Sequence, residues 1–171
     1  MILLAASPVQ AEVCLPIGRP LYLCTHDTAW ANGTASIVTN ARGQRDGYEL
    51  PLAGEFLTLR VGTVAEADLR GAPSEFDLAA ATLALENHMR RRGLESPLPI
   101  IERFRAKGED GNAASIAFDD PLESRVVAVS IVFDGTDIVL IETRETATST
   151  FTQEHRNRHL QAIDGLTRTP R

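Results

Sequence analysis

The chain has 171 residues, and its 17 basic and 23 acidic side chains give a formal net charge of −6. This length suits one domain with a single core, and the hydrophobic fraction of 43% is ordinary for a globular domain. The negative charge argues against general binding to nucleic acid or to an anionic membrane, because both need concentrated positive charge. No apolar run approaches the roughly 20 residues of a membrane helix. The sequence therefore predicts no transmembrane segment.

Residues 1–11, MILLAASPVQA, resemble the end of a secretory signal peptide. An apolar stretch precedes compact residues at Val9 and Ala11, the −3 and −1 positions before Glu12. The usual basic start is missing, and the apolar part is shorter than the usual ~7 to 15 residues. We expect a signal-peptide remnant over 1–11 and one α+β domain over 12–171. The expected location is periplasmic or secreted, in a bacterial envelope, or cytoplasmic if the first residues are not a signal remnant.

Cys14 and Cys24 are the only cysteines in the sequence. In an oxidising compartment, a lone pair this close indicates a disulfide, which in a loop this short stabilises a fold by about 2 to 3 kcal/mol. His26 and Asp27 follow, so a metal cluster is conceivable, but the spacing matches no metal motif. We favour a structural disulfide over metal or redox chemistry.

The segment 14–34 is rich in Pro, Gly, Thr and Asn, and we expect a loop with one short strand around residues 21–23. Trp30, the only tryptophan, lies in it. Packing on the sheet edge is the favoured role, because aromatic side chains mainly supply buried area. The alternative is that Trp30 contacts a ligand or partner, so it remains a candidate for a partner surface.

Alternating apolar residues next predict strands over residues 35–39, 47–52 and 55–64. A helix should follow, with Ser74 as N-cap and Gly93 as the residue that ends it. Its sequence is rich in Ala, Leu, Glu and Arg, and its apolar arc, which includes Leu83, Leu85 and Met89, should lie across a sheet.

Arg90, Arg91 and Arg92 close this helix. Cations in a last turn complement the helix dipole, typically by ~0.3 to 1 kcal/mol each. The alternative is a patch that binds an anion or a partner protein. We favour the helix-end role, because no aromatic residue or second basic cluster accompanies the three arginines.

The second half of the chain predicts an antiparallel meander. Strands over residues 100–106 and 113–118 should precede a long hairpin from Arg125 to Thr143, which turns around residues 134–137. Its two strands are apolar on nearly both faces, so we expect them inside a covered sheet. The predicted fold is a central antiparallel sheet flanked by two helices.

His155 and His159 lie four residues apart on the second predicted helix, residues 150–166, for which Thr150 is the expected N-cap. Paired histidines at this spacing occur in zinc helices. However, the glutamate of the HExxH motif is absent, Arg156 and Arg158 stand between or beside the rings, and no third ligand is evident. We favour structural histidines and keep both as metal candidates. Nucleophile, P-loop and dinucleotide motifs are missing, so the sequence predicts no catalytic residue and no cofactor.

The order of elements resembles the PsbP-like architecture, shared with DcrB-like bacterial envelope proteins and small mycobacterial lipoproteins. The resemblance covers the layout of about residues 35–168. It is carried by the helix DLAAATLALENHMRRRGLE, the strand PIIERFRA and the closing FTQEHRNRHLQAIDGLTR, while Trp30 echoes an aromatic residue that precedes the first strands of the family. The resemblance implies a central antiparallel sheet flanked by helices, and accessory, adaptor or chaperone-like roles.

We therefore expect a non-enzymatic exported accessory or adaptor protein that binds another protein. One alternative is an immunity or chaperone protein for a secretion-system effector. Another is a protein that binds a metal or small molecule through His155 and His159.

Overall fold

The computed structural model describes ten stretches of the chain: residues 14–18, 21–39, 42–52, 57–64, 78–91, 99–107, 112–120, 123–134, 137–146 and 150–168. The expected signal remnant over 1–11 and the expected helix-end residues Ser74, Arg92 and Gly93 lie outside these stretches.

The described elements are ten strands, two α-helices and one 3-10 helix. In chain order they are β1 (Cys14–Gly18), β2 (Leu21–Cys24), η1 (Ala29–Asn32), β3 (Ser36–Thr39), β4 (Arg45–Pro51), β5 (Leu57–Val64), α1 (Leu78–Arg91), β6 (Ile100–Lys107), β7 (Asn112–Asp120), β8 (Arg125–Asp134), β9 (Asp137–Thr146), α2 (Gln153–Asp164) and β10 (Leu166–Thr167).

Seven strands form one antiparallel sheet in the order β3-β4-β5-β9-β8-β7-β6. The predicted α+β class and the meander from β6 to β9 are confirmed. The predicted hairpin is the β8–β9 pair, in which Arg125 is opposite Thr146 and Asp134 is opposite Asp137. It lies between other strands, and its apolar side chains such as Val129 and Ile141 are fully buried, as expected for a sheet that is covered on both faces.

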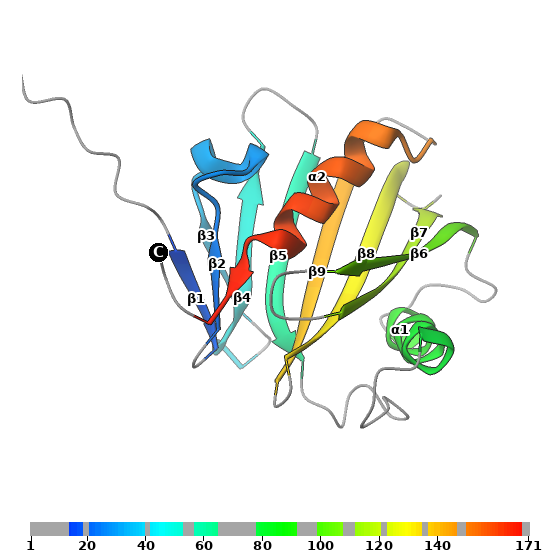
Figure 1. Ribbon diagram of the computed structural model, residues 1–171, viewed down its shortest axis with the longest axis horizontal. Coiled ribbons are helices and arrows are strands. Elements are labelled where there is room, and N and C mark those ends of the chain that lie inside the picture. The colour runs from blue at the N-terminus through cyan, green and yellow to red at the C-terminus, as the bar shows by residue number, and fades with distance from the viewer. Residues whose placement is uncertain are drawn as a thin grey trace, which may run out of the picture.

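Different elements cover the two faces of this sheet. On one face, α2 crosses the strands diagonally, and a small sheet of order β1-β2-β10 lies beside it (Figure 1). On the other face, α1 packs Leu85 and Met89 against β7 and β8. Because successive side chains in a strand point to opposite faces, Ile116 meets α1 while its neighbour Ser115 points toward α2. Leu83 corrects one expectation, because it is 56% exposed and lies outside the buried arc of α1.

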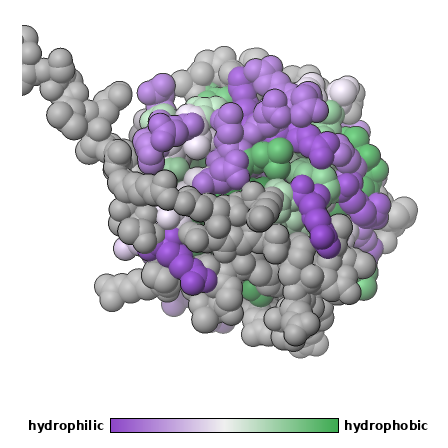
Figure 2. All heavy atoms as spheres, viewed as in Figure 1, coloured by the Kyte–Doolittle hydropathy of each residue, from purple (hydrophilic) through white to green (hydrophobic). Residues whose placement is uncertain are grey.

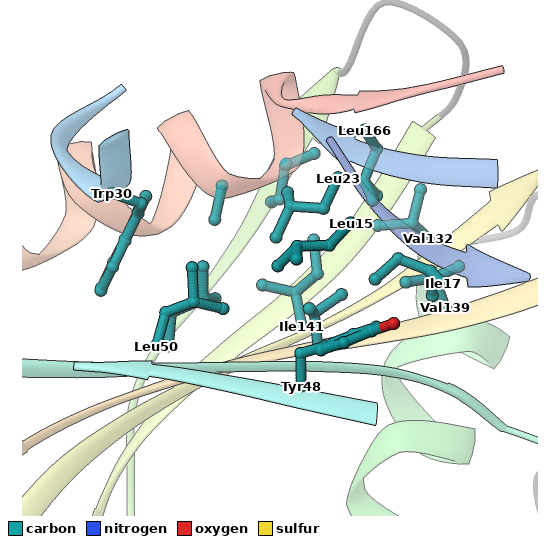
Figure 3. Packing of buried hydrophobic residues seen from close by; sticks show 14 of the residues in the cluster. Leu15, Ile17, Leu23, Trp30, Tyr48, Leu50, Val132, Val139, Ile141 and Leu166 are labelled. Atoms are coloured by element: carbon teal, nitrogen blue, oxygen red, sulfur yellow. The ribbon is translucent and has the colours of Figure 1, made fainter. Parts of the chain in front are cut away.

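The main core lies between the large sheet and the small sheet. Figure 3 shows Leu15, Ile17, Leu23 and Leu166 of the small sheet facing side chains of the large one. The large-sheet residues labelled there are Tyr48, Leu50, Val132, Val139 and Ile141. Strand β1 was not predicted, yet its Leu15 and Ile17 complete this core. The predicted loop over 14–34 is therefore largely two strands and a short helix.

The N-cap of helix α2 lies two residues later than predicted. This cap is Thr152, whose hydroxyl accepts a hydrogen bond from the backbone N–H of His155 at 3.0 Å. This is the usual way to satisfy a free N–H in a first turn, and it replaces the expected cap at Thr150. The helix ends before Gly165, where a Cβ would lie only 2.6 Å from the carbonyl oxygen of Cys24. Only glycine allows this approach. Within the described part of the chain, neither helix is long and apolar enough to cross a membrane.

Candidate functional site

A buried chain of polar side chains joins α2 to the large sheet. Ser115, Ser130 and Thr143 come from β7, β8 and β9, and they face His155 and His159 of α2. Ser115 Oγ is 2.6 Å from Ser130 Oγ, and Ser130 Oγ is 2.6 Å from His159 Nε2. Thr143 Oγ1 is 2.8 Å from His159 Nδ1 and 2.8 Å from His155 Nε2. The helical spacing of the two histidines thus places both rings over three adjacent strands.

Burial keeps both imidazoles neutral. The pKa of His155 is lowered to about 4 by desolvation, although a hydrogen bond to the backbone of Thr143 acts in the opposite direction. The pKa of His159 is lowered to about 3 by desolvation and then by the nearby His155. A buried imidazolium is unfavourable for the same reason that any buried charge is unfavourable. At neutral pH each ring therefore carries one N–H.

The carboxylate of Glu145 sets the direction of these hydrogen bonds. His155 Nδ1 lies 3.1 Å from Glu145 Oε2, off the line of a true hydrogen bond, and neither atom has another partner among the described residues. An N–H at this position is favourable, whereas a lone pair would repel the carboxylate. His155 Nε2 must then accept from Thr143, which has one proton to donate.

The remaining donors follow by counting protons. Since the Thr143 hydroxyl donates to His155, it accepts from His159 Nδ1–H. His159 Nε2 then accepts from Ser130, and Ser130 accepts from Ser115. Each hydroxyl of the chain, both ring nitrogens of His159 and Nε2 of His155 then have a hydrogen-bond partner, and both histidines carry the proton on Nδ1. A buried network of this kind favours one arrangement of the helix on the sheet.

The distance between Ser130 and His159 is that of a nucleophile and its general base, but the surroundings do not suit catalysis. Ser115, Ser130, Thr143 and His159 have no exposed surface, and His155 is 1% exposed. Aromatic rings close this end of α2, since Phe151 contacts His155 at 5.0 Å and Phe104 contacts His159 at 6.0 Å between ring centroids. The hydrogen bond between Ser130 and His159 therefore holds α2 on the large sheet.

Within the described residues, the two histidines lack the ligand set of a metal site. Across the described stretches, no group of three or more His, Cys, Asp or Glu side chains could hold a metal ion. Both nitrogens of His159 and one of His155 are already bonded to hydroxyl groups. The hydroxyl partners were not anticipated from sequence. Their signal was weak: polar residues that interrupt apolar strands, Ser115 and Ser130, and the last residue of the predicted hairpin, Thr143.

Cys14 and Cys24 form the predicted disulfide. The two residues are directly opposite each other in the β1–β2 pair, so the bond fastens the small sheet. Cys24 also lines a shallow hollow of about 220 Å³, together with His26, Asp27, Thr28, Gln161, Asp164, Gly165 and Thr167. His26 Nε2 is 3.0 Å from Asp27 Oδ2, and burial raises the pKa of Asp164. The hollow is acidic, but its carboxylates are largely solvated.

Trp30 lies inside the molecule, which corrects its place among the partner-surface candidates. It belongs to η1, has no exposed surface, and packs in the main core (Figure 3). Its indole Nε1–H donates to the carbonyl oxygen of Arg158 at 3.1 Å. The favoured role, packing, agrees with this burial. The polar sequence that suggested the surface alternative includes Thr28, which is the cap of η1.

Arg90 is the one residue of the arginine run whose side chain the structure describes. It donates to Asn87 Oδ1 at 2.7 Å and lies 3.3 Å from Glu86 Oε2. The other carboxylate oxygen of Glu86 accepts from Arg103 of β6 at 2.7 Å. Arg90 is thus part of an ion cluster that ties α1 to β6. The side chain of Arg91, like Arg92 as a whole, lies outside the described structure.

The large sheet ends in two different edge strands. Strand β6 carries Glu102, Arg103, Arg105 and Lys107, and its pairing with β7 is interrupted between Ile100 and Glu102. Charges and a bulge are the usual protection of an edge against unwanted pairing. In contrast, β3 reads Ser-Ile-Val-Thr, has no charge, and has Ile37 exposed by 63%.

Helix α2 also covers one side of β6. Arg156 forms an ion pair with Glu102, and its guanidinium lies 4.7 Å from the centre of the Phe104 ring. Phe104 in turn stacks on Phe151 at 5.9 Å. Hydrophilic side chains gather over the outer face of α2 (Figure 2). Among the described elements, β3 pairs only with β4.

No family model matches the chain, and no curated protein matches it either. The resemblance in layout to PsbP-like proteins therefore rests on the sequence pattern alone.

Proposed function

We propose that this protein is a non-enzymatic accessory protein of the bacterial envelope that binds another protein at the β3 edge of its large sheet. The observation that carries the proposal is the contrast between β3 and β6. An exposed, uncharged strand rich in β-branched residues is a template for a further strand, and binding proteins use such edges to capture extended segments. Ile37, Val38 and Thr39 supply this character.

The groups that suggested other chemistry are engaged in holding the fold together. His155 and His159 are hydrogen-bonded in the core, and Trp30 is buried. Arg90 belongs to the ion cluster between α1 and β6. Among the described residues, these contacts leave the edges of the sheet for interaction, and β3 is the edge without charged side chains.

Export is part of the proposal. A disulfide between Cys14 and Cys24 is compatible with an oxidising compartment, and the compact residues before Glu12 agree with it. Titration of free thiols in protein isolated from its native envelope fraction tests this point. Fully oxidised cysteines are expected, and two free thiols would argue for a reducing compartment.

The binding function is tested by affinity capture from the native envelope fraction with three forms of the protein. These are the wild type, Ile37→Lys in β3, and Ile101→Lys in β6 as the matched control, since Ile101 is also an exposed isoleucine on an edge strand, 45% accessible. We expect one stoichiometric protein with the wild type and with the control, and its loss with Ile37→Lys. Its identity would separate an accessory role from an immunity or chaperone role. A partner that ignores Ile37→Lys, or depends on Ile101, would contradict the assignment to β3.

A further inference from the structure

We infer that the segment captured at β3 is an extended, uncharged stretch of another protein with apolar residues at alternate positions. This inference rests on the proposed function and specifies the chemistry of its partner. It follows from the register of β3, from the point where the core stops, and from the distribution of charge.

The register places one side chain of β3 on the core face. Ile37 is opposite Tyr48 of β4, and directly opposed residues share a face of the sheet. Tyr48 is buried in the main core, and Ala35 packs partly against it. Ile37 is 63% exposed, so the main core stops at β4, and a further strand beside β3 would cover this side chain. An incoming residue opposite Ile37 must be apolar to extend that core.

The neighbouring positions of the incoming strand are less restricted in side-chain type. Ser36 and Val38 point to the other face, opposite Glu49 and Gly47, where Gly47 offers no side chain to contact. A strand paired with β3 alternates in the same way. The captured segment should therefore be apolar at every second residue and variable, although uncharged, at the others.

Charge separates a foreign segment from a second copy of this chain. Strand β3 has no charged side chain, so a charged residue of an incoming strand finds no ion-pair partner in it. Each copy of the protein has a net charge of −6, so two copies repel one another. A neutral to basic protein is the better partner.

Arg45 of β4 lies at one end of this edge without changing the pattern. Arg45 donates to the Tyr48 hydroxyl at 3.0 Å, and its guanidinium lies 5.5 Å from the centre of the Tyr48 ring. Arg45 thus caps the outer side of Tyr48 at the end of the β3–β4 pair. It marks where the apolar part of the edge stops, so the paired stretch of the partner should be short.

The experiment selects ligands from a random-peptide display library with the full chain as bait and Ile37→Lys as counter-selection. We expect enriched peptides with Val, Ile or Thr at alternate positions and few Asp or Glu residues. N-methylation of alternate backbone nitrogens along one edge of the best peptide should weaken binding by more than about tenfold, the equivalent of about 1.4 kcal/mol, because it removes the donors that face β3. Ile101→Lys should bind the peptide like the wild type.

Four outcomes would overturn the inference: no enrichment, acidic peptides, peptides with helical spacing, or binding that survives N-methylation. Self-association of the wild type that Ile37→Lys abolishes would assign the edge to a second copy instead. The capture experiment separates this failure from that of the function. If a native partner is captured only when Ile37 is present, but the selected peptides lack the alternating pattern, the binding function stands and this account of the ligand falls.

Discussion

The two edges of the large sheet are built for different tasks. Strand β6 is held from both sides, because Arg156 of α2 pairs with Glu102 and Glu86 of α1 pairs with Arg103. Strand β3 makes described strand contacts only with β4 and carries an exposed isoleucine. These ion pairs tie β6 to both helices, while the surface available for pairing lies at the opposite end of the sheet. Substitutions near β6 should change stability, and substitutions in β3 should change binding.

The largest loss of stability should come from His159→Ala. The change leaves a cavity and removes partners from Ser130 and Thr143, and cavities and unpaired buried polar groups each cost several kcal/mol. We expect the free energy of unfolding to fall by about 3 to 5 kcal/mol in chemical denaturation. Asn157→Ala, on the exposed side of the same helix, should change it by less than about 0.5 kcal/mol. A loss below about 1 kcal/mol for His159→Ala would show that the polar chain does not hold α2.

Lowering the pH should reduce the free energy of unfolding through the same two histidines. Both histidines have folded-state pKa values, about 4 and about 3, below the usual 6.5. As pH falls below 6.5, the unfolded chain binds protons that the folded chain does not, so stability decreases down to the folded values. From the pKa shifts, the loss at pH 5 is about 2 kcal/mol per histidine. Burial, with the repulsion of Glu154, raises the pKa of Glu145 and partly offsets the loss at lower pH.

The pH dependence is measured by denaturation between pH 7 and pH 5. His159→Gln removes one titrating group and should roughly halve the slope. An unchanged slope in His159→Gln would mean that other groups govern the acid response.

The disulfide should matter less than the polar chain. Replacing Cys14 and Cys24 by Ala together should lower the free energy of unfolding by about 2 to 3 kcal/mol, the value for a loop of this length. Hydrogen exchange should accelerate first in β1 and β2 and should leave α2 protected. The same loss should appear in the wild type under reductant. If reductant does not change the stability of the wild type, the disulfide does not stabilise the fold.

A smaller effect is expected for Arg156→Ala, which removes a partly exposed ion pair and the stacking on Phe104. Partly exposed contacts of these kinds contribute about 0.5 to 1 kcal/mol. Thermal denaturation should show the loss, and Arg156→Lys should recover only part of it, because an ammonium lacks the flat stacking surface. If Arg156→Lys has the full stability of the wild type, the positive charge alone explains the contribution of Arg156.

The smallest change of stability belongs to Ile37→Lys. Its site is largely exposed, so the free energy of unfolding should stay within about 0.5 kcal/mol of the wild type, although binding at β3 is lost. A clear destabilisation would show that Ile37 has a structural role, and the two edges would then be less distinct than described.

The strands of the large sheet were readable from the sequence because each signal is local. Alternation identified β5, and two β-branched runs around Asp134–Asp137 identified the β8–β9 hairpin. Strands β1 and β10 were missed, since each is short and depends on β2, its neighbour only in space. Only part of the polar chain was predictable from the sequence: the spacing of His155 and His159 placed them on one helix face. Their partners Ser130 and Thr143 lie on separate strands, and only the sheet register brings them together.

Strand β2 is bordered on one side by β1 and on the other by β10, and this arrangement gives the fold an order of completion. Strands β1 and β2, which carry Cys14 and Cys24, are the first described strands to be synthesised. Leu166 pairs with Leu23, so the third strand of the small sheet is added only when synthesis has passed residue 167. Helix α2, which carries both core histidines, also emerges late. A chain that stops before α2 therefore lacks most of the cover on one face of its sheet, and quality-control proteases should recognise it as incomplete.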